Sequence, residues 1–385
     1  MKKYPTLIFG RIGLIILVTA GPLASGAPSG RSAPGQDQRA TLQAGAKVYR
    51  AACINCHGPD GKGVSQSIVG FTQSIRDFTD CKSTAREPDS DWLAVVTLGG
   101  PARGFSELMP AFDKALTADE IEQVVAYLRT FCPGHAWPRG DLNLPRAFFT
   151  EKAFPEDEAV LTSAVNTKGP GLITNAIVYE QRLGARNQFE VKAPFGWQRT
   201  TAGDGTPDWT SNLGDIALGV KHVLYHSFER GSILSAGAEI IMPTGDEAQG
   251  FGSGTFIFEP FFSFGQVLPA DFFLHAQAGA ELPFQTEKAE GEGYFKLALG
   301  RSFDSGRWGR SWSPIVELLA VRELAAGALI DLDIVPQLQV TLNKRKNIMA
   351  SVGVRFPLNH TAGRSPQVVF YLLWDWFDGT LFEGW

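Results

Sequence analysis

Two cysteines and a histidine stand close together in the stretch AACINCHGPDGKG near the start of the chain. Cys53 and Cys56 are separated by two residues, and His57 follows directly. The pattern CxxCH is typical of heme attachment, because each thiol can add across one vinyl group while the adjacent imidazole binds the iron. A CxxC redox pair or half of a zinc site is the alternative, but no second CxxC completes a zinc site. The histidine therefore favours one covalent heme c.

A six-coordinate heme needs a second axial ligand, and Met109 is the best candidate. It lies in the stretch ELMPAF, ahead of a predicted helix, whereas the other methionines lie at the start of the chain or in β-patterned sequence. A lone methionine usually fills a core, but one followed by proline in a loop suits a fixed ligand. His135, beyond that helix, is the competing ligand. We predict that His57 and Met109 coordinate the iron, with a raised potential because a thioether stabilises ferrous iron.

Helices are predicted on both sides of the attachment motif. The stretch TLQAGAKVYRAAC leads into it, and TADEIEQVVAYLRTFC closes the segment. Thr117 and Glu120 stand at the spacing of a capping box. Apolar residues then recur every three or four positions, as in an amphipathic helix. Residues 41–135 are therefore expected to form a small helical domain.

This domain resembles a small class I cytochrome c over residues 40–133. Besides the attachment motif and Met109, Gly45 and Tyr49 match the glycine and the aromatic residue of the family's opening helix, and Tyr127 matches the aromatic residue of its closing helix. The resemblance implies an all-α fold and a crossing of the two helices at Gly45 against the turn of Tyr127.

Cys81 and Cys132 depart from the simplest members of that family. Both fit a disulfide that ties the middle loop to the end of the closing helix. A closed loop of this size contributes about 4 kcal/mol in the chain-entropy view of disulfides. Two separate buried thiols are the alternative, which export to an oxidising compartment disfavours.

The N-terminus has the layout of a secretory signal. Lys2, Lys3 and Arg11 precede a short apolar run and then small residues, so we predict a signal peptide over residues 1–26. Residues 27–40 are rich in Pro, Gly and Ser and are expected to form a flexible leader. The formal net charge of −5 and the scattered basic residues predict no nucleic-acid partner.

Beyond residue 135 the pattern changes to alternating strands, after a predicted linker over residues 136–170. DFFLHAQAGAEL, SILSAGAEIIM and LIDLDIVPQLQVTL each place apolar side chains on one face and polar or charged ones on the other. About 11 strands of roughly ten residues follow one another, which is long enough to cross a bilayer. We predict an antiparallel transmembrane β-barrel of 10–12 strands over residues 171–385.

A soluble β-sandwich or a lipocalin-like barrel is the alternative, because it would show the same alternation with the faces inverted. Carboxylates such as Asp331, Asp333, Glu239 and Glu281 would be costly in a dry core but suit a wet lumen. The region also resembles, in pattern, the outer-membrane porin and transporter-type barrels of Gram-negative bacteria. That resemblance implies contact with outer-membrane lipid.

The two parts together resemble fused cytochrome–porin proteins. We therefore expect an exported, multidomain outer-membrane protein whose periplasmic heme domain transfers single electrons. Its partners would be a periplasmic redox carrier and an unknown electron donor or acceptor. The heme domain is expected to dock below the barrel, and no catalytic residues of its own are expected. Two alternatives are an outer-membrane channel for small solutes with an accessory heme domain, and a soluble periplasmic electron-transfer protein with a β-rich binding module.

Overall fold

The computed structural model describes residues 34–70, 75–134, 136–169, 171–201, 207–305 and 309–383. The predicted signal peptide and the first part of the predicted leader therefore lie outside the described residues. Within the described ranges, no helix has both the length and the hydropathy needed to cross a membrane.

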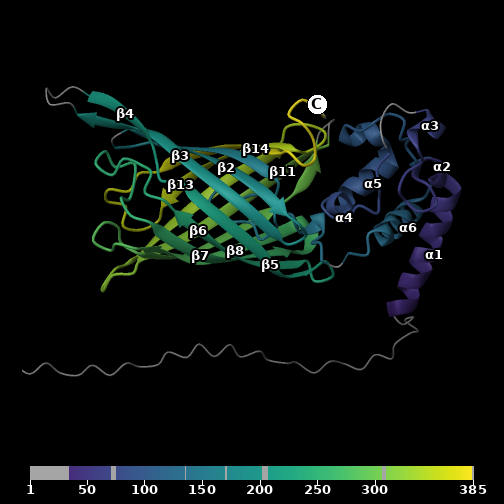
Figure 1. Ribbon diagram of the computed structural model, residues 1–385, viewed down its shortest axis with the longest axis horizontal. Helices are drawn as coiled ribbons and strands as arrows, with labels where there is room; N and C mark the ends of the chain where they lie inside the picture. Colours follow the sequence, from purple (N-terminus) through teal and green to yellow (C-terminus); the bar gives the residue numbers. More distant parts are fainter. Residues whose placement is uncertain are drawn as a thin grey trace, which may run out of the picture. The chain divides into compact units, whose positions relative to one another are not determined.

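In its described residues, the first domain contains six α-helices (Figure 1). They are α1 (Pro34–Ala52), α2 (Ile54–His57), α3 (Gln66–Val69), α4 (Cys81–Thr84), α5 (Asp89–Leu98) and α6 (Ala118–Leu128). Short 3₁₀ turns, η1 (Gly100–Arg103) and η2 (Arg129–Phe131), follow α5 and α6. The predicted leader ends too late, because α1 already begins at Pro34. Proline is tolerated in a first helical turn, and Asp37 there is favourable at the positive end of the helix dipole.

The opening and closing helices meet at Gly45. A side chain there would clash, because a Cβ on Gly45 would lie 2.0 Å from the carbonyl oxygen of Gln123 and 2.9 Å from Cβ of Tyr127. This is the crossing that the resemblance to cytochromes c implied. Helix α6 begins with the predicted capping box: Glu120 N–H donates to Thr117 Oγ1, and Thr117 N–H donates to Glu120 Oε2.

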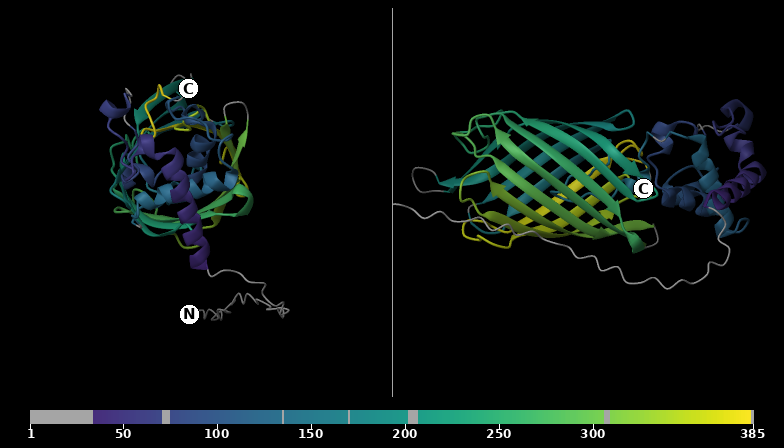
Figure 2. Two further views of the ribbon diagram at one scale, coloured as in Figure 1. Left: turned by 90° about the vertical axis from the view of Figure 1, so that its right-hand side faces the viewer. Right: turned by 90° about the horizontal axis from the view of Figure 1, so that it is seen from below.

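The second domain is a closed antiparallel barrel (Figure 2). Its strands are β1 (Glu158–Asn166), β2 (Leu172–Leu183), β3 (Asn187–Thr201), β4 (Pro207–Leu213), β5 (Ala217–Ser227), β6 (Ser232–Ile241), β7 (Ile257–Val267), β8 (Phe272–Pro283), β9 (Glu292–Arg301), β10 (Phe303–Ser305), β11 (Arg310–Glu323), β12 (Ile330–Thr341), β13 (Ile348–Pro357) and β14 (Gln367–Asp375).

Twelve strands close the barrel when each interrupted strand is counted once, and this number lies within the predicted range of 10–12. Strands β4 and β5 both pair with β3, one beyond the other, and together count as one interrupted strand of the barrel. Strands β9 and β10 pair with β11 in the same way and count as a second one. The ring closes where β1 pairs with β14 and where β9 pairs with β11. Among the strands that the structure describes, no edge is left open along the ring, which a barrel in lipid requires.

The two faces of the barrel divide as the alternation predicted. On β12, Asp333 and Gln337 point inward and are buried, whereas Ile330, Leu332 and Leu338 are exposed. Many large apolar side chains share the outward orientation, among them Leu161, Ile177, Val220, Phe262, Phe295, Val316, Val352 and Phe370. An apolar exterior around a polar lumen is the arrangement of a transmembrane barrel and the inverse of a soluble one.

The predicted linker of residues 136–170 is largely structured. Its last part is strand β1, which begins at Glu158. Its middle part, residues 140–157, is called the lumen segment below. It begins with the 3₁₀ turn η3 (Gly140–Leu142), where Gly140 N–H donates to Ala85 O of the helical domain, and from Leu142 onward it packs inside the barrel. Leu142, Ala153 and Phe154 in this segment pack against Val223 and Ile233 of the barrel wall. The sequence predicted a linker here because the contacts that order this segment join residues far apart in the sequence.

Candidate heme site

The attachment motif begins at Cys53, between α1 and α2, and continues through α2, which carries Cys56 and His57. His57 N–H donates to Cys53 O at 2.9 Å, and Gly58 ends α2 with a φ of 72°. The fully buried Tyr49 hydroxyl donates to Gly58 O at 2.7 Å. The loop then folds back, with Val64 N–H donating to Cys56 O at 2.8 Å. These bonds fix the backbone that carries both thiols and the imidazole.

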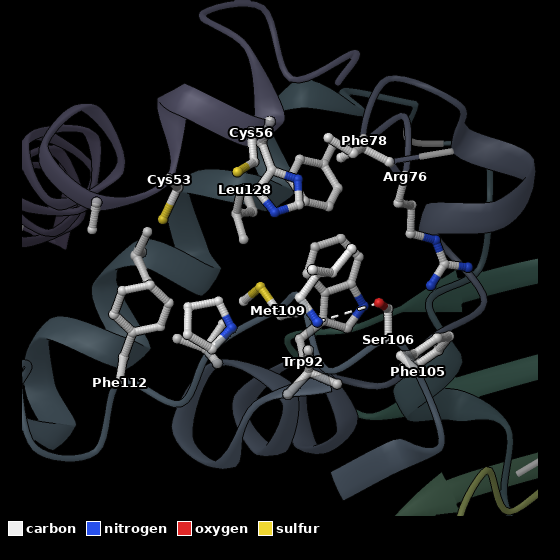
Figure 3. Close-up of a pocket in the computed structure, with 18 of the residues that line it drawn as sticks. Cys53, Cys56, Arg76, Phe78, Trp92, Phe105, Ser106, Met109, Phe112 and Leu128 are labelled. Atoms are coloured by element: carbon white, nitrogen blue, oxygen red, sulfur yellow. Dashed lines mark hydrogen bonds between the residues drawn. The ribbon is translucent and has the colours of Figure 1, made fainter. Parts of the chain in front are cut away.

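The motif opens onto a cavity of about 480 Å³. Cys53, Cys56, His57 and Met109 all line it, so the structure brings the four predicted residues together. Figure 3 shows the sulfur atoms of Cys53 and Cys56 on one side of the cavity and the sulfur of Met109 across from them. The rest of the lining is mainly apolar: Ala52, Ile75, Phe78, Trp92, Val95, Val96, Phe105, Leu108, Pro110, Phe112, Val124 and Leu128.

The chemistry of the motif fits a heme. Cys53 and Cys56 are free thiols. The Nδ1 atom of His57 is buried and has no hydrogen-bond partner among the described residues. Burial lowers the pKa of His57 to about 4, so the imidazole is neutral at pH 7, the form that binds iron. A macrocycle would fill the cavity and meet both thiols.

The loop that carries Met109 depends on two glycines that the sequence analysis did not single out. A Cβ on Gly100 would lie 2.1 Å from Ser106 O, and one on Gly99, where φ is 83°, would lie 2.9 Å from Met109 O. Gly100 N–H donates to Met109 O at 3.0 Å, and Met109 N–H donates to Ser106 O at 3.2 Å (Figure 3). The adjacent glycines after the helix were the signal in the sequence.

Aromatic residues form the wall beside the motif, and sequence reasoning missed them as well. Phe78 stacks on His57 with ring centroids 4.7 Å apart, and it contacts Trp92 at 5.3 Å. Arg129 places its guanidinium 4.6 Å from the Trp92 ring centroid. The Nε1 atom of Trp92 is buried without a hydrogen-bond partner among the described residues. The spacing of these residues in the sequence gives no sign that they converge.

Cys81 and Cys132 form a disulfide, with their Cα atoms 5.2 Å apart. The bond connects the start of α4 to the segment after η2. It leaves Cys53 and Cys56 as the free cysteines of the domain. The competing ligand His135 lies outside the described residues.

The rim of the cavity also contacts the barrel. Lys346, in the turn between β12 and β13, lies 3.4 Å from the carboxylate of Asp91. Its neighbour Arg345 donates to Gly104 O at 2.6 Å and lies 4.3 Å from the Phe105 ring centroid. Because Asp91 and Phe105 line the cavity, the turn between β12 and β13 supports one edge of the site.

Comparisons with known proteins match the two domains separately. Residues 40–128 match a family model described as cytochrome C oxidase, cbb3-type, subunit III. Residues 164–356, half of the chain, match the family described as putative MetA-pathway of phenol degradation. The chain belongs to the putative MetA-pathway family. In this member of that family, the barrel is joined to a cytochrome c domain, which is a heme-binding domain.

Solved structures similar to this member of the putative MetA-pathway family include one outer membrane channel and two porins. An outer membrane channel from Pseudomonas putida F1 is 13% identical with a TM-score of 0.41, covering 60% of this chain and 99% of that one. The KdgM porin is 8% identical with a TM-score of 0.37, covering 56% and 98%. The NanC porin is 7% identical with a TM-score of 0.40, covering 56% and 97%. No curated protein matches the sequence.

The barrel spans the outer membrane. It is a single-chain antiparallel barrel with an even number of strands around its circumference, an apolar exterior and a polar interior, and barrels of this kind occur in that membrane. The alternative of a soluble β-rich binding module is therefore not supported.

Proposed function

We propose that the protein is a monoheme c-type cytochrome that transfers single electrons at the outer membrane, with its heme domain on the periplasmic side. The observation that carries the proposal is the cavity in which Cys53, Cys56, His57 and Met109 converge. The partners would be a periplasmic redox carrier and a second electron donor or acceptor of unknown identity.

The residues of the cavity have distinct roles in this proposal. Cys53 and Cys56 would hold one heme c through thioethers, and His57 and Met109 would provide the axial ligands. When bound, the heme supplies reversible one-electron exchange between ferrous and ferric iron. Phe78 keeps water from the imidazole, because it stacks on the ring of His57 and is itself backed by Trp92. No residue is needed as a general acid or base.

A periplasmic position of the heme domain follows the usual topology of these barrels. In a barrel with an even number of strands, the first strand begins and the last strand ends on the same side of the membrane. In outer-membrane barrels the short turns face the periplasm. The chain runs from the heme domain through the lumen segment into β1. The heme domain also contacts the short turn between β12 and β13. These contacts support a heme site held beside the periplasmic mouth.

The proposal predicts heme in a heat-modifiable outer-membrane band. Outer membranes would be extracted with detergent and run on denaturing gels with and without boiling, then stained for heme peroxidase activity. We expect the stain to follow the band that shifts on boiling, and external protease to leave the heme domain uncut in intact cells. Stain confined to the soluble periplasm, or cleavage of the heme domain from outside, would contradict the proposal.

A further inference from the structure

The lumen segment contacts the barrel wall around its whole circumference. Apart from Leu142, Ala153 and Phe154, which meet β5 and β6, its residues Leu144 and Ala147 pack against Phe273 of β8, Ala298 of β9 and Ile315 of β11. Phe148 contacts Tyr371 of β14, with ring centroids 5.1 Å apart. A segment that packs against strands on opposite sides of a barrel fills the lumen between them and blocks passage through it.

Glu317 on β11 is the strongest single anchor of the segment. Its buried carboxylate accepts hydrogen bonds from three successive backbone N–H groups: Phe148 at 2.7 Å, Phe149 at 3.0 Å and Thr150 at 2.9 Å. It also accepts from Thr150 Oγ1 at 2.9 Å. Removing this carboxylate would leave the buried N–H groups without an acceptor, which is costly.

Other wall side chains hold the rest of the segment by its backbone. Glu151 N–H donates to Gln277 Oε1 at 3.0 Å, and Glu156 N–H donates to Gln188 Oε1 at 2.7 Å. Tyr371 and Ser235 donate to carbonyl oxygens of the segment from two further strands. Between η3 and β1 the segment forms no regular strand or helix. The wall side chains therefore provide the hydrogen bonds that secondary structure would otherwise supply to its backbone.

Charged side chains of the segment also pair with the wall. Arg146 lies 3.0 Å from Glu180 and also contacts Glu158. Lys152 lies 3.4 Å from Glu158, and Lys221 of the wall lies 2.6 Å from Glu151 of the segment. The segment thus brings two cations, Arg146 and Lys152, and two anions, Glu151 and Glu156, into the lumen, where each cation faces a carboxylate of the wall.

The wall by itself carries an excess of negative charge. The carboxylates that face the lumen around this region are Glu158, Glu180, Glu190, Glu239, Glu259, Glu281, Glu317 and Asp333, and the cations are Arg182, Lys192, Lys221, Lys296, Arg355 and Arg364. A narrow lumen lined by one sign of charge concentrates ions of the opposite sign. An unblocked lumen would therefore favour small cations.

We propose that the lumen segment is a plug that closes the barrel to ions, and that its displacement opens a cation-selective channel. The plug is covalently continuous with the heme domain through residues 136–139. The proposal does not depend on heme ligation, because the contacts that carry it lie within the barrel.

Planar bilayer recordings of the full-length protein in KCl test this proposal. The wild type is expected to stay closed for most of the recording. Glu317→Ala is expected to raise the open probability at least tenfold, because the plug loses its main anchor. Glu259→Ala is the matched control: Glu259 is also a buried lumen carboxylate, but it accepts a hydrogen bond from Tyr294 Oη at 2.6 Å rather than from the segment. Arg146→Ala provides a second opening variant, and heat-modifiable migration verifies that every variant is folded.

Two further readouts separate a displaced plug from a damaged barrel. In a KCl gradient, the reversal potential of the Glu317→Ala channel should shift towards the potassium equilibrium potential. Adding Ala153→Cys and Ser235→Cys, whose residues are joined by a 2.5 Å hydrogen bond, should close the channel again on oxidation and reopen it on reduction. A steadily open wild type, folded Glu317→Ala and Arg146→Ala variants that both stay closed, chloride selectivity, or a formed crosslink without closure would each overturn the proposal.

Discussion

Replacing both Cys53 and Cys56 with serine is expected to abolish covalent heme. Both thiols are free and line the cavity, so each can form a thioether, and serine cannot. Heme staining of a denaturing gel should fall to background for the double variant. Each single variant should keep a reduced stain, because one thioether remains.

The disulfide provides the matched control for this experiment. Cys81→Ser with Cys132→Ser also removes two cysteines from the same domain, but these residues are paired and do not line the cavity. That variant should keep the heme stain while losing stability, by about 2–4 kcal/mol for a typical disulfide. In both double variants the barrel should still migrate as a heat-modifiable band. Full staining of Cys53→Ser/Cys56→Ser would show that the heme is attached elsewhere.

Replacing Met109 with alanine is expected to remove the axial thioether but leave the heme attached. The near-infrared band that marks methionine ligation of ferric heme should disappear. The midpoint potential should fall by on the order of 0.1 V, within the roughly 0.8 V range that axial ligands span, because ferrous iron loses its thioether ligand. Optical spectra and a potentiometric titration of the purified protein measure both effects.

Met242→Ala is the control for that variant, since Met242 follows β6 in the barrel and should leave the spectrum and the potential unchanged. His135→Ala tests the competing ligand. An unchanged near-infrared band in Met109→Ala would contradict the assignment of Met109. Loss of the band in His135→Ala alone would point to a rearranged site instead.

Local patterns in the sequence were enough to predict much of the structure. Cys53, Cys56 and His57 lie within one turn, so their type and spacing predict their chemistry without knowledge of the fold. Alternation along a strand is also local, which is why the inward Asp333 and the outward Ile330 were assigned to the correct faces. The capping box at Thr117 likewise depends only on residues three positions apart.

Features that depend on distant contacts could not be read in the same way. Strand β1 falls within the predicted linker, and what makes it part of the barrel is its pairing with β14, which joins opposite ends of the barrel sequence. The lumen segment has no periodic pattern, since its hydrogen bonds go to side chains such as Glu317. Phe78 packs on His57, and Trp92 packs on Phe78, only after the domain has folded.

A redox titration of the purified full-length protein tests the central claim most directly. Heme content would be determined from the pyridine hemochrome spectrum and compared with protein content, and the heme absorbance would be followed as the potential is changed in both directions. The account predicts one heme per chain and a single reversible one-electron transition. A chain purified from the outer membrane without heme, or a heme that shows no reversible one-electron transition, would contradict it.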